Sequence, residues 1–125
     1  MARKIITTKA DRQTLSTWLN YWLEVYAKPN VTLSTYRGYE SVVRNHVISE
    51  IGNIRLCDLR KSDLQQFFNK KSTEGRIDKT DGGLSQKSMK NIYYVIHIAL
   101  QSAFESGVMQ NNPVVKIKMP TCEER

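Results

Sequence analysis

The chain of 125 residues is long enough for one domain with a modest hydrophobic core. Charged residues make up 25% of it and hydrophobic residues 40%, which is typical of folded soluble proteins and argues against disorder throughout. Lysines and arginines number 19 against 12 acidic residues, and the resulting formal net charge of +7 favours an anionic partner.

Residues 1–12 carry basic side chains without apolar periodicity, which predicts a flexible basic lead-in. A first helix is expected to begin near Thr14 and to end at Pro29 and Asn30. Because aromatic side chains dominate core burial, we expect its two tryptophans to anchor the core rather than to stack on bases. The apolar residues recur at helical steps on one face: Leu15, Trp18, Leu19, Trp22, Val25 and Tyr26.

A second helix is predicted to begin near Ser34, a suitable N-cap residue, and to run to about Ile48. We expect residues 49–54 to form a turn around Gly52 and Asn53. One side of this helix carries the apolar residues Tyr36, Tyr39, Val43 and Val47, and the other side carries Arg37, Ser41, Arg44 and Asn45.

A third, shorter helix is predicted over residues 60–71, with Leu64, Phe67 and Phe68 facing inward. Asp63 lies in its first turn, where a carboxylate favours the helix dipole. Residues 72–83 lack apolar periodicity and are rich in Gly, Asp and Lys, which indicates a loop or a small hairpin.

The longest helical pattern lies between Ser85, a suitable N-cap, and Gly107, a suitable residue for the left-handed position after a helix. A helix of this length would span about 32 Å. Its apolar face comprises Met89, Ile92, Ile96, Ala99, Leu100 and Ala103. Its opposite face carries Lys87, Lys90, Asn91, Tyr94 and Gln101, which suits a polyanion.

Residues 108–120 are expected to be extended, because Pro113 and Pro120 disfavour helix. No strand-length alternation and no internal repeat is visible, so the sequence predicts an all-α protein. We expect a helical domain over residues 13–112 and an extended exit linker over residues 113–125.

The order of these segments resembles the core-binding domain of tyrosine recombinases, the family of phage and transposon integrases. The similarity extends over roughly residues 13–120. It is carried by a Trp-rich first helix LSTWLNYWLEVY, then STYRGYESVVRNHVISEIGNIRLCDL, a short DLQQFF helix, and LSQKSMKNIYYVIHIALQSAFESGVMQNNPV with its Asn-Pro exit. The resemblance implies a four-helix SAM-like bundle that forms half of a C-shaped clamp around the recombination core site on double-stranded DNA.

The catalytic residues of that family are not visible in this sequence. The family uses an arginine, a His-x-x-Arg motif and a nucleophilic tyrosine, and neither His46 nor His97 is followed by arginine at the required spacing. We therefore expect an isolated domain that is not itself an enzyme, whose parent adds a C-terminal catalytic domain and assembles with other integrase protomers.

Helices fit the DNA major groove, where Arg can bond guanine and Asn or Gln can bond adenine, while Lys and Arg neutralise phosphates. A helix N-terminus is also a natural phosphate site. Two alternatives remain open, namely ordinary solvated helix faces and a helical protein-interaction module that binds an acidic partner. The predicted DNA-binding residues are Ser34, Thr35, Arg37, Ser41, Arg44, Asn45, Ser85, Gln86, Lys87, Lys90, Asn91 and Tyr94.

No metal site or cofactor is predicted, because His46 and His97 have no Cys or second His at ligand spacing. Cys57 and Cys122 stand alone, which suits a reducing cytoplasm, and we expect Cys57 to be buried and Cys122 to be exposed. The N-terminus has no apolar stretch of a secretory signal, and no run approaches the roughly 18 apolar residues of a membrane span.

Overall fold

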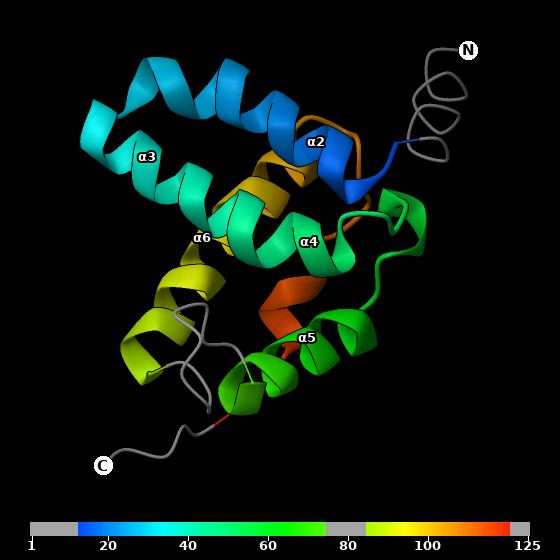
Figure 1. Ribbon diagram of the computed structural model, residues 1–125. Coiled ribbons are helices and arrows are strands. Elements are labelled where there is room, and N and C mark those ends of the chain that lie inside the picture. Colours follow the sequence, from blue (N-terminus) through cyan, green and yellow to red (C-terminus); the bar gives the residue numbers. More distant parts are fainter. Residues whose placement is uncertain (1–12, 75–84, 121–125) are drawn as a thin grey trace.

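The structure, a computed structural model, describes residues 13–74 and 85–120. The predicted basic lead-in, most of the predicted loop and Cys122 lie outside these residues. In the described ranges helices are joined by turns and loops, and the only β pairing there is one isolated bridge between Thr14 and Arg55, so the all-α prediction is confirmed (Figure 1). The helices are α2 (Leu15–Trp22), α3 (Leu33–Val42), α4 (Ile48–Ile51), α5 (Lys61–Glu74) and α6 (Gln86–Glu105).

Shorter helical turns continue or connect these helices. The π-helical turn η1 (Leu23–Ala27) extends α2, and the π-helical turn η3 (Val43–Val47) joins α3 to α4 as one long arm. The remaining turns are 3₁₀ helices: η2 (Lys28–Asn30), η4 (Leu56–Asp58) and η5 (Pro113–Lys116). The residues that the structure describes thus fold into four helical arms. These are α2 with η1, then α3 with η3 and α4, then α5, and then α6.

The first helix begins and ends as predicted, but its inward register changes after Trp22. The Thr14 hydroxyl caps the helix by accepting the Thr17 N–H at 3.2 Å. The wider π turn then places Leu23 and Ala27 inside and leaves Val25 and Tyr26 exposed by 44% and 39%. The prediction that these last two residues face the core is therefore wrong, because it assumed uniform α-helical steps.

The second helix begins earlier than predicted, because Thr32 and not Ser34 is its N-cap. The Thr32 hydroxyl accepts the backbone N–H of Thr35 at 3.2 Å, which leaves Ser34 exposed in the first helical turn. The helical arm also extends to Ile51, so the turn is confined to the following residues. The predicted inward side is confirmed, since Tyr36, Val43 and Val47 are buried and Tyr39 is half-buried.

Helix α5 buries Leu64, Phe67 and Phe68 as predicted, and it continues to Glu74 where a loop was expected. Cys57 is exposed rather than buried, because the three-residue turn η4 directs Leu56 into the core instead.

The C-terminal segment is not wholly extended. Pro113 opens the turn η5, since a proline at the first position of a helix loses no hydrogen bond. Val114 then packs into the core with no exposed surface, so the helical unit continues past residue 112.

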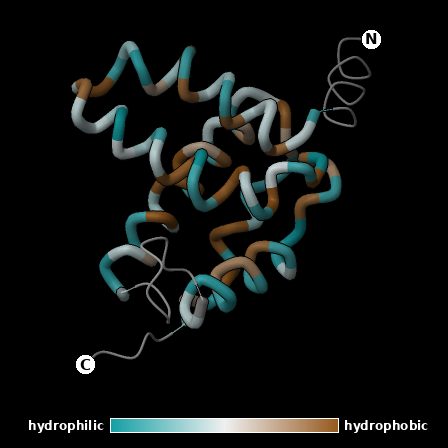
Figure 2. The backbone as a smooth tube through the Cα atoms, in the orientation of Figure 1, coloured by the Kyte–Doolittle hydropathy of each residue, from teal (hydrophilic) through white to brown (hydrophobic). Residues whose placement is uncertain are grey.

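Helix α6 forms the centre of the fold and matches its prediction at both ends. The Ser85 hydroxyl accepts the Ser88 N–H at 3.2 Å, and Gly107 adopts a φ of 81°. The helix packs against α2, α3, η3, α5 and η5, and Figure 2 shows the hydrophobic stretches of these elements turned toward the interior. Seven of its residues are buried: Met89, Ile92, Val95, Ile96, Ala99, Leu100 and Ala103.

Two aromatic interactions attach the N-terminal helices to α6. The indole N–H of Trp18 donates a buried hydrogen bond of 2.9 Å to the Ala99 carbonyl. The ring of Trp22 stacks on Tyr39 at a centroid distance of 5.6 Å, and Tyr39 in turn lies 6.4 Å from the ring of Tyr94 on α6. The expectation that both tryptophans anchor the core is confirmed, as they are 2% and 4% exposed.

We expect Trp18→Phe to destabilise the protein by about 1 kcal/mol more than Trp22→Phe does. Both changes remove similar ring surface, but only the first removes a buried hydrogen bond to the backbone. Urea denaturation of the two variants measures the difference in the free energy of unfolding. Equal losses would mean that the Trp18 bond adds nothing to stability.

Candidate nucleic-acid interface

The first turns of α6 carry an exposed polar stripe. Lys90 and Asn91 lie three and four residues after Lys87, and Tyr94 lies four and three residues after them, which places all four on one side of the helix. All four are exposed, and Tyr94 keeps 53% of its surface accessible. Neither lysine forms an ion pair with a carboxylate of the described residues. We call these four residues the α6 stripe.

Ser85 and Gln86 lie beside this stripe but are engaged within the protein. Ser85 caps α6, as described above, and remains exposed. Gln86 is half-buried and donates a hydrogen bond of 3.3 Å to the Pro120 carbonyl. The nearby Gln65 bonds both backbone groups of Lys118 at 2.8 Å. The C-terminal segment is therefore held along α5 and the start of α6.

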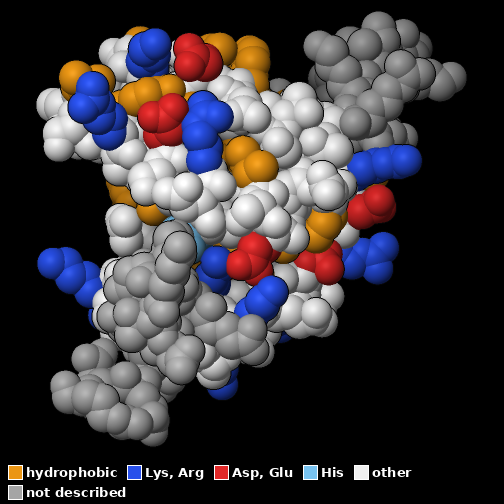
Figure 3. Space-filling model, in the orientation of Figure 1, with side chains coloured by type: hydrophobic (Ala, Val, Ile, Leu, Met, Phe, Trp, Pro, Cys, Tyr) orange, Lys and Arg blue, Asp and Glu red, His pale blue; other side chains and the backbone are white. Residues whose placement is uncertain are grey.

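The second predicted surface lies on α3 and η3. Arg37, Ser41, Arg44 and Asn45 are all exposed, as predicted. Arg44 forms an ion pair of 3.2 Å with Glu40, and the Asn45 amide donates to the Ser41 hydroxyl at 3.2 Å. Figure 3 shows such a mixture of basic and acidic side chains over the visible face of these helices.

Ser34 and Thr35 lie in the first turn of α3 and are exposed. The Thr35 hydroxyl accepts a hydrogen bond of 3.1 Å from the Thr32 hydroxyl, so it supports the capping interaction of the helix.

Helices α3 and α6 meet where Tyr39 contacts Tyr94. Burial, and next the hydrogen-bonded hydroxyl of Tyr94, raise the pKa of Tyr39, so the Tyr39 phenol stays neutral near pH 7. At about 100° per residue, Arg37 lies roughly 200° around α3 from Tyr39. The structure thus joins the α6 stripe to the Tyr39 side of α3 and directs the Arg37 side away from it.

A charged cluster that contains one buried lysine was not predicted by the sequence analysis. Lys71 is 4% exposed, and its Nζ lies 2.6 Å from a Glu50 carboxylate oxygen and 5.6 Å from the centre of the Phe67 ring. Lys70 contacts the same carboxylate at 3.4 Å. Glu50 lies on α4 and the two lysines lie on α5, so no local sequence pattern predicts that they form a cluster. Its only hint is Lys71 at an inward step from Phe67 and Phe68.

His46 lies next to this cluster, and its Nδ1 atom is buried without a hydrogen-bond partner among the described residues. Burial and next the positive charge of Lys71 lower its pKa from 6.5, while Glu50 acts in the opposite direction. His97 stacks on the Tyr93 ring at 5.9 Å, consistent with the packing role expected for it. The described residues contain no group of three or more His, Cys, Asp or Glu side chains that could hold a metal ion.

Comparison with known proteins identifies the family. The family model of the phage integrase N-terminal SAM-like domain matches residues 14–72. The chain is 36% identical to the phage integrase SAM-like domain from Moorella thermoacetica, whose solution NMR structure it matches with a TM-score of 0.71 over 92% of this chain and 93% of that one. The chain belongs to the phage integrase SAM-like domain family. Both the predicted fold and the predicted family are thereby confirmed.

Other relatives of this SAM-like domain set the context. An integrase of Saccharopolyspora erythraea is 27% identical over 119 residues, which cover 95% of this chain and 26% of that protein, so the chain spans about a quarter of the relative. The fold is shared with the N-terminal domain of the prophage pi2 protein 01 integrase from Lactococcus lactis (20% identity, TM-score 0.74, 89% and 97% coverage). It is shared too with an integrase-like domain from Bacillus cereus (21% identity, TM-score 0.76, 92% and 90% coverage). No helix among the residues described for the SAM-like domain is long and apolar enough to cross a membrane.

We expect the stability of the SAM-like domain to fall as the pH drops below 6.5, because of His46. In this window the unfolded chain binds a proton that folded His46 does not, so the free energy of unfolding decreases. Burial raises the pKa of Glu50, but the combined effect of Lys71 and Lys70 is larger and lowers it from 4.5, so that residue contributes a separate loss of stability below pH 4.5.

Urea denaturation at pH values of about 7.5 and 5.5, both sides of the ordinary histidine pKa, measures this dependence. His46→Gln should flatten it, whereas the control His97→Gln should retain it. An unchanged dependence in His46→Gln would assign the loss to another group.

Proposed function

We propose that this integrase domain binds duplex DNA through the α6 stripe and the exposed polar side of α3 and η3, and so holds the recombination core site. The observation that carries the proposal is the α6 stripe itself, in which two lysines without a carboxylate partner among the described residues adjoin an amide and a phenol on a firmly packed helix. Membership of the integrase family supports it.

The dimensions of the stripe suit a DNA groove. From Lys87 to Tyr94 the helix rises about 10 Å, comparable with the roughly 12 Å width of the major groove. In this arrangement Lys87 and Lys90 neutralise phosphates, and Asn91, one turn beyond Lys87 in the stripe, can bond the edge of an adenine through its amide. The exposed N-terminus of α6 at Ser85 adds a site for one phosphate.

The α3 and η3 surface has a secondary role in this proposal. Arg37 is free of described carboxylates, so it contacts a flanking phosphate. Arg44 would exchange its ion pair with Glu40 for a phosphate, and since an exposed pair contributes only about 0.3–0.5 kcal/mol, the exchange is favourable. Ser34, Thr35, Ser41 and Asn45 offer uncharged hydrogen-bonding groups alongside.

In the parent integrase the domain would act together with a catalytic domain and further protomers around the same DNA. Dividing the contacts between linked domains raises the effective concentration of each. The isolated domain is therefore proposed to bind weakly, with an affinity that depends strongly on salt.

Fluorescence anisotropy with a labelled duplex over a range of salt concentrations tests the proposal. Binding must appear at low salt, where counterion release favours it most, and must weaken as salt is added. If no binding is detected at low salt, the DNA proposal fails and an acidic protein partner takes its place.

We expect Lys90→Ala to weaken DNA binding and to reduce the slope of log K against log salt by about one unit. Its melting temperature should stay nearly unchanged, because the side chain is exposed and unpaired. Lys70→Ala is the matched control, since Lys70 is exposed on α5 and pairs with Glu50. Equal slopes for the two variants would remove the α6 stripe from the interface.

A further inference from the structure

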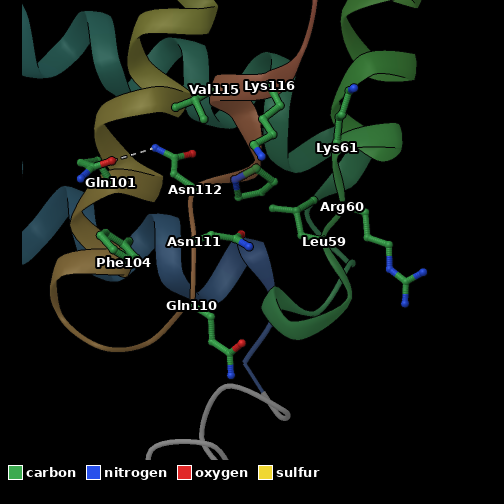
Figure 4. A pocket seen from close by; sticks show the side chains of 11 residues that line it. Leu59, Arg60, Lys61, Gln101, Phe104, Gln110, Asn111, Asn112, Val115 and Lys116 are labelled. Carbon is green, nitrogen blue, oxygen red and sulfur yellow. Dashed lines mark hydrogen bonds between the residues drawn. The ribbon is translucent and has the colours of Figure 1, made fainter.

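A second surface with the features of a binding site lies at the other end of α6. A pocket of about 590 Å³ opens between the last turns of α6, the segment leading into η5, and the start of α5. Figure 4 shows Leu59, Arg60 and Lys61 on one side of it and Gln101 and Phe104 on the other. Seventeen residues of α6 separate Phe104 from Lys87, or roughly 25 Å along the helix.

The charged residues that line this pocket all carry the same sign. Arg60, Lys61 and Lys116 line it, and no carboxylate does. None of the three forms an ion pair with a described acidic residue. The guanidinium of Arg60 takes no part in the cap of α5, because the Asp63 carboxylate accepts the backbone N–H of Arg60 instead. The pocket therefore presents positive charge without internal compensation.

The rest of the lining combines amides with exposed apolar groups. Asn112 is structural, because both ends of its side-chain amide form hydrogen bonds within the protein. Its amide nitrogen donates to the His97 carbonyl at 3.1 Å, and its amide oxygen accepts the Val114 N–H at 3.2 Å. Gln110 and Asn111 are exposed and form no hydrogen bond with another described residue. Phe104 and Val115 keep 44% and 48% of their surface accessible.

We propose that this pocket binds an acidic segment of a partner protein that carries an apolar side chain. Arg60, Lys61 and Lys116 would pair with the carboxylates, the free amides would bond the peptide backbone, and the apolar side chain would cover Phe104 and Val115. Exposed apolar side chains surrounded by polar groups are a common mark of protein–protein contacts.

Other occupants fit the lining less well. A DNA backbone offers phosphates for the cations but no apolar group for Phe104 and Val115. A second copy of this chain carries a net charge of +7 and would be repelled. The chain's own C-terminal segment leads away from the pocket, since Lys118 is bonded to Gln65 and Pro120 to Gln86 at the opposite end of α6.

The test uses the full 125-residue chain and a fluorescent peptide in which one phenylalanine is flanked by aspartates on both sides. Two control peptides replace the phenylalanine by serine or the aspartates by lysines. Two double variants that lose equal charge are compared, Arg60→Gln with Lys116→Gln, and Lys87→Gln with Lys90→Gln. All four side chains are exposed, so both variants should melt like the wild type.

We expect the acidic peptide to bind, to shift the NMR amide signals of Asn111 and Lys116, and to lose affinity about tenfold in the pocket variant only. The control peptides should bind more weakly, and DNA should be affected chiefly by the Lys87 and Lys90 variant. The DNA measurement is separate, so failure of the DNA proposal would leave this one standing.

Several results would overturn the proposal. Equal losses of peptide affinity in both variants would reduce it to general charge attraction. Equal binding of the serine peptide would exclude the apolar contact. DNA binding lost mainly in the pocket variant would make nucleic acid the ligand, and amide shifts that depend on protein concentration alone would indicate a second copy.

Discussion

The hydrogen bond from the Trp18 indole to the Ala99 carbonyl joins the first and last helices of the domain across 81 positions of sequence. A buried indole N–H needs a partner, and this bond fixes the rotation of α6 relative to α2. With that rotation fixed, Met89 and Ile92 face the core. Lys90 and Asn91, on the other side of the same turn, must then face outward, so the polar surface of α6 follows from the packing of its apolar surface.

Helix α6 could be predicted almost completely because its information is local. A hydroxyl cap, an unbroken 3.6-residue period and a glycine at the left-handed position all agree there. In the first helix the π turn adds one residue to a turn, and Ala27 becomes buried where Tyr26 was expected. The widened turn η1 packs against α3, and it leaves no mark in the periodicity.

Two other differences had signals in the sequence that were weighed wrongly. Thr32 and Ser34 are both capping residues, and hydroxyl chemistry alone does not choose between two candidates so close together. Pro113 favours an extended segment when it is considered only as a helix breaker, although proline is well suited to the first helical position. By contrast, the pairing of Lys71 with Glu50 joins separate helices and could emerge only from the folded arrangement.

In the candidate surfaces too, features that depend on spacing within one helix could be predicted from the sequence, whereas contacts between distant segments could not. Spacing along α6 sufficed to predict which side chains share its polar face. It did not show that Gln86 is engaged with Pro120, or that Arg60 and Lys116 line one pocket, because these residues meet only through the return of the C-terminal segment.

The two ends of α6 therefore present positive charge to different surroundings, and the helix between them limits how they can influence each other. Seven buried side chains and the Trp18 bond hold the helix in place. A ligand at one end could alter the other only by moving α6 as a whole, against closely packed neighbours. A ligand that binds without changing this packing has the same affinity whether or not the other end of α6 is occupied, so it cannot influence binding there. DNA at the α6 stripe and an acidic segment at the pocket should consequently bind independently. The remaining coupling is the repulsion between these two anionic ligands, which salt screens over about 10 Å.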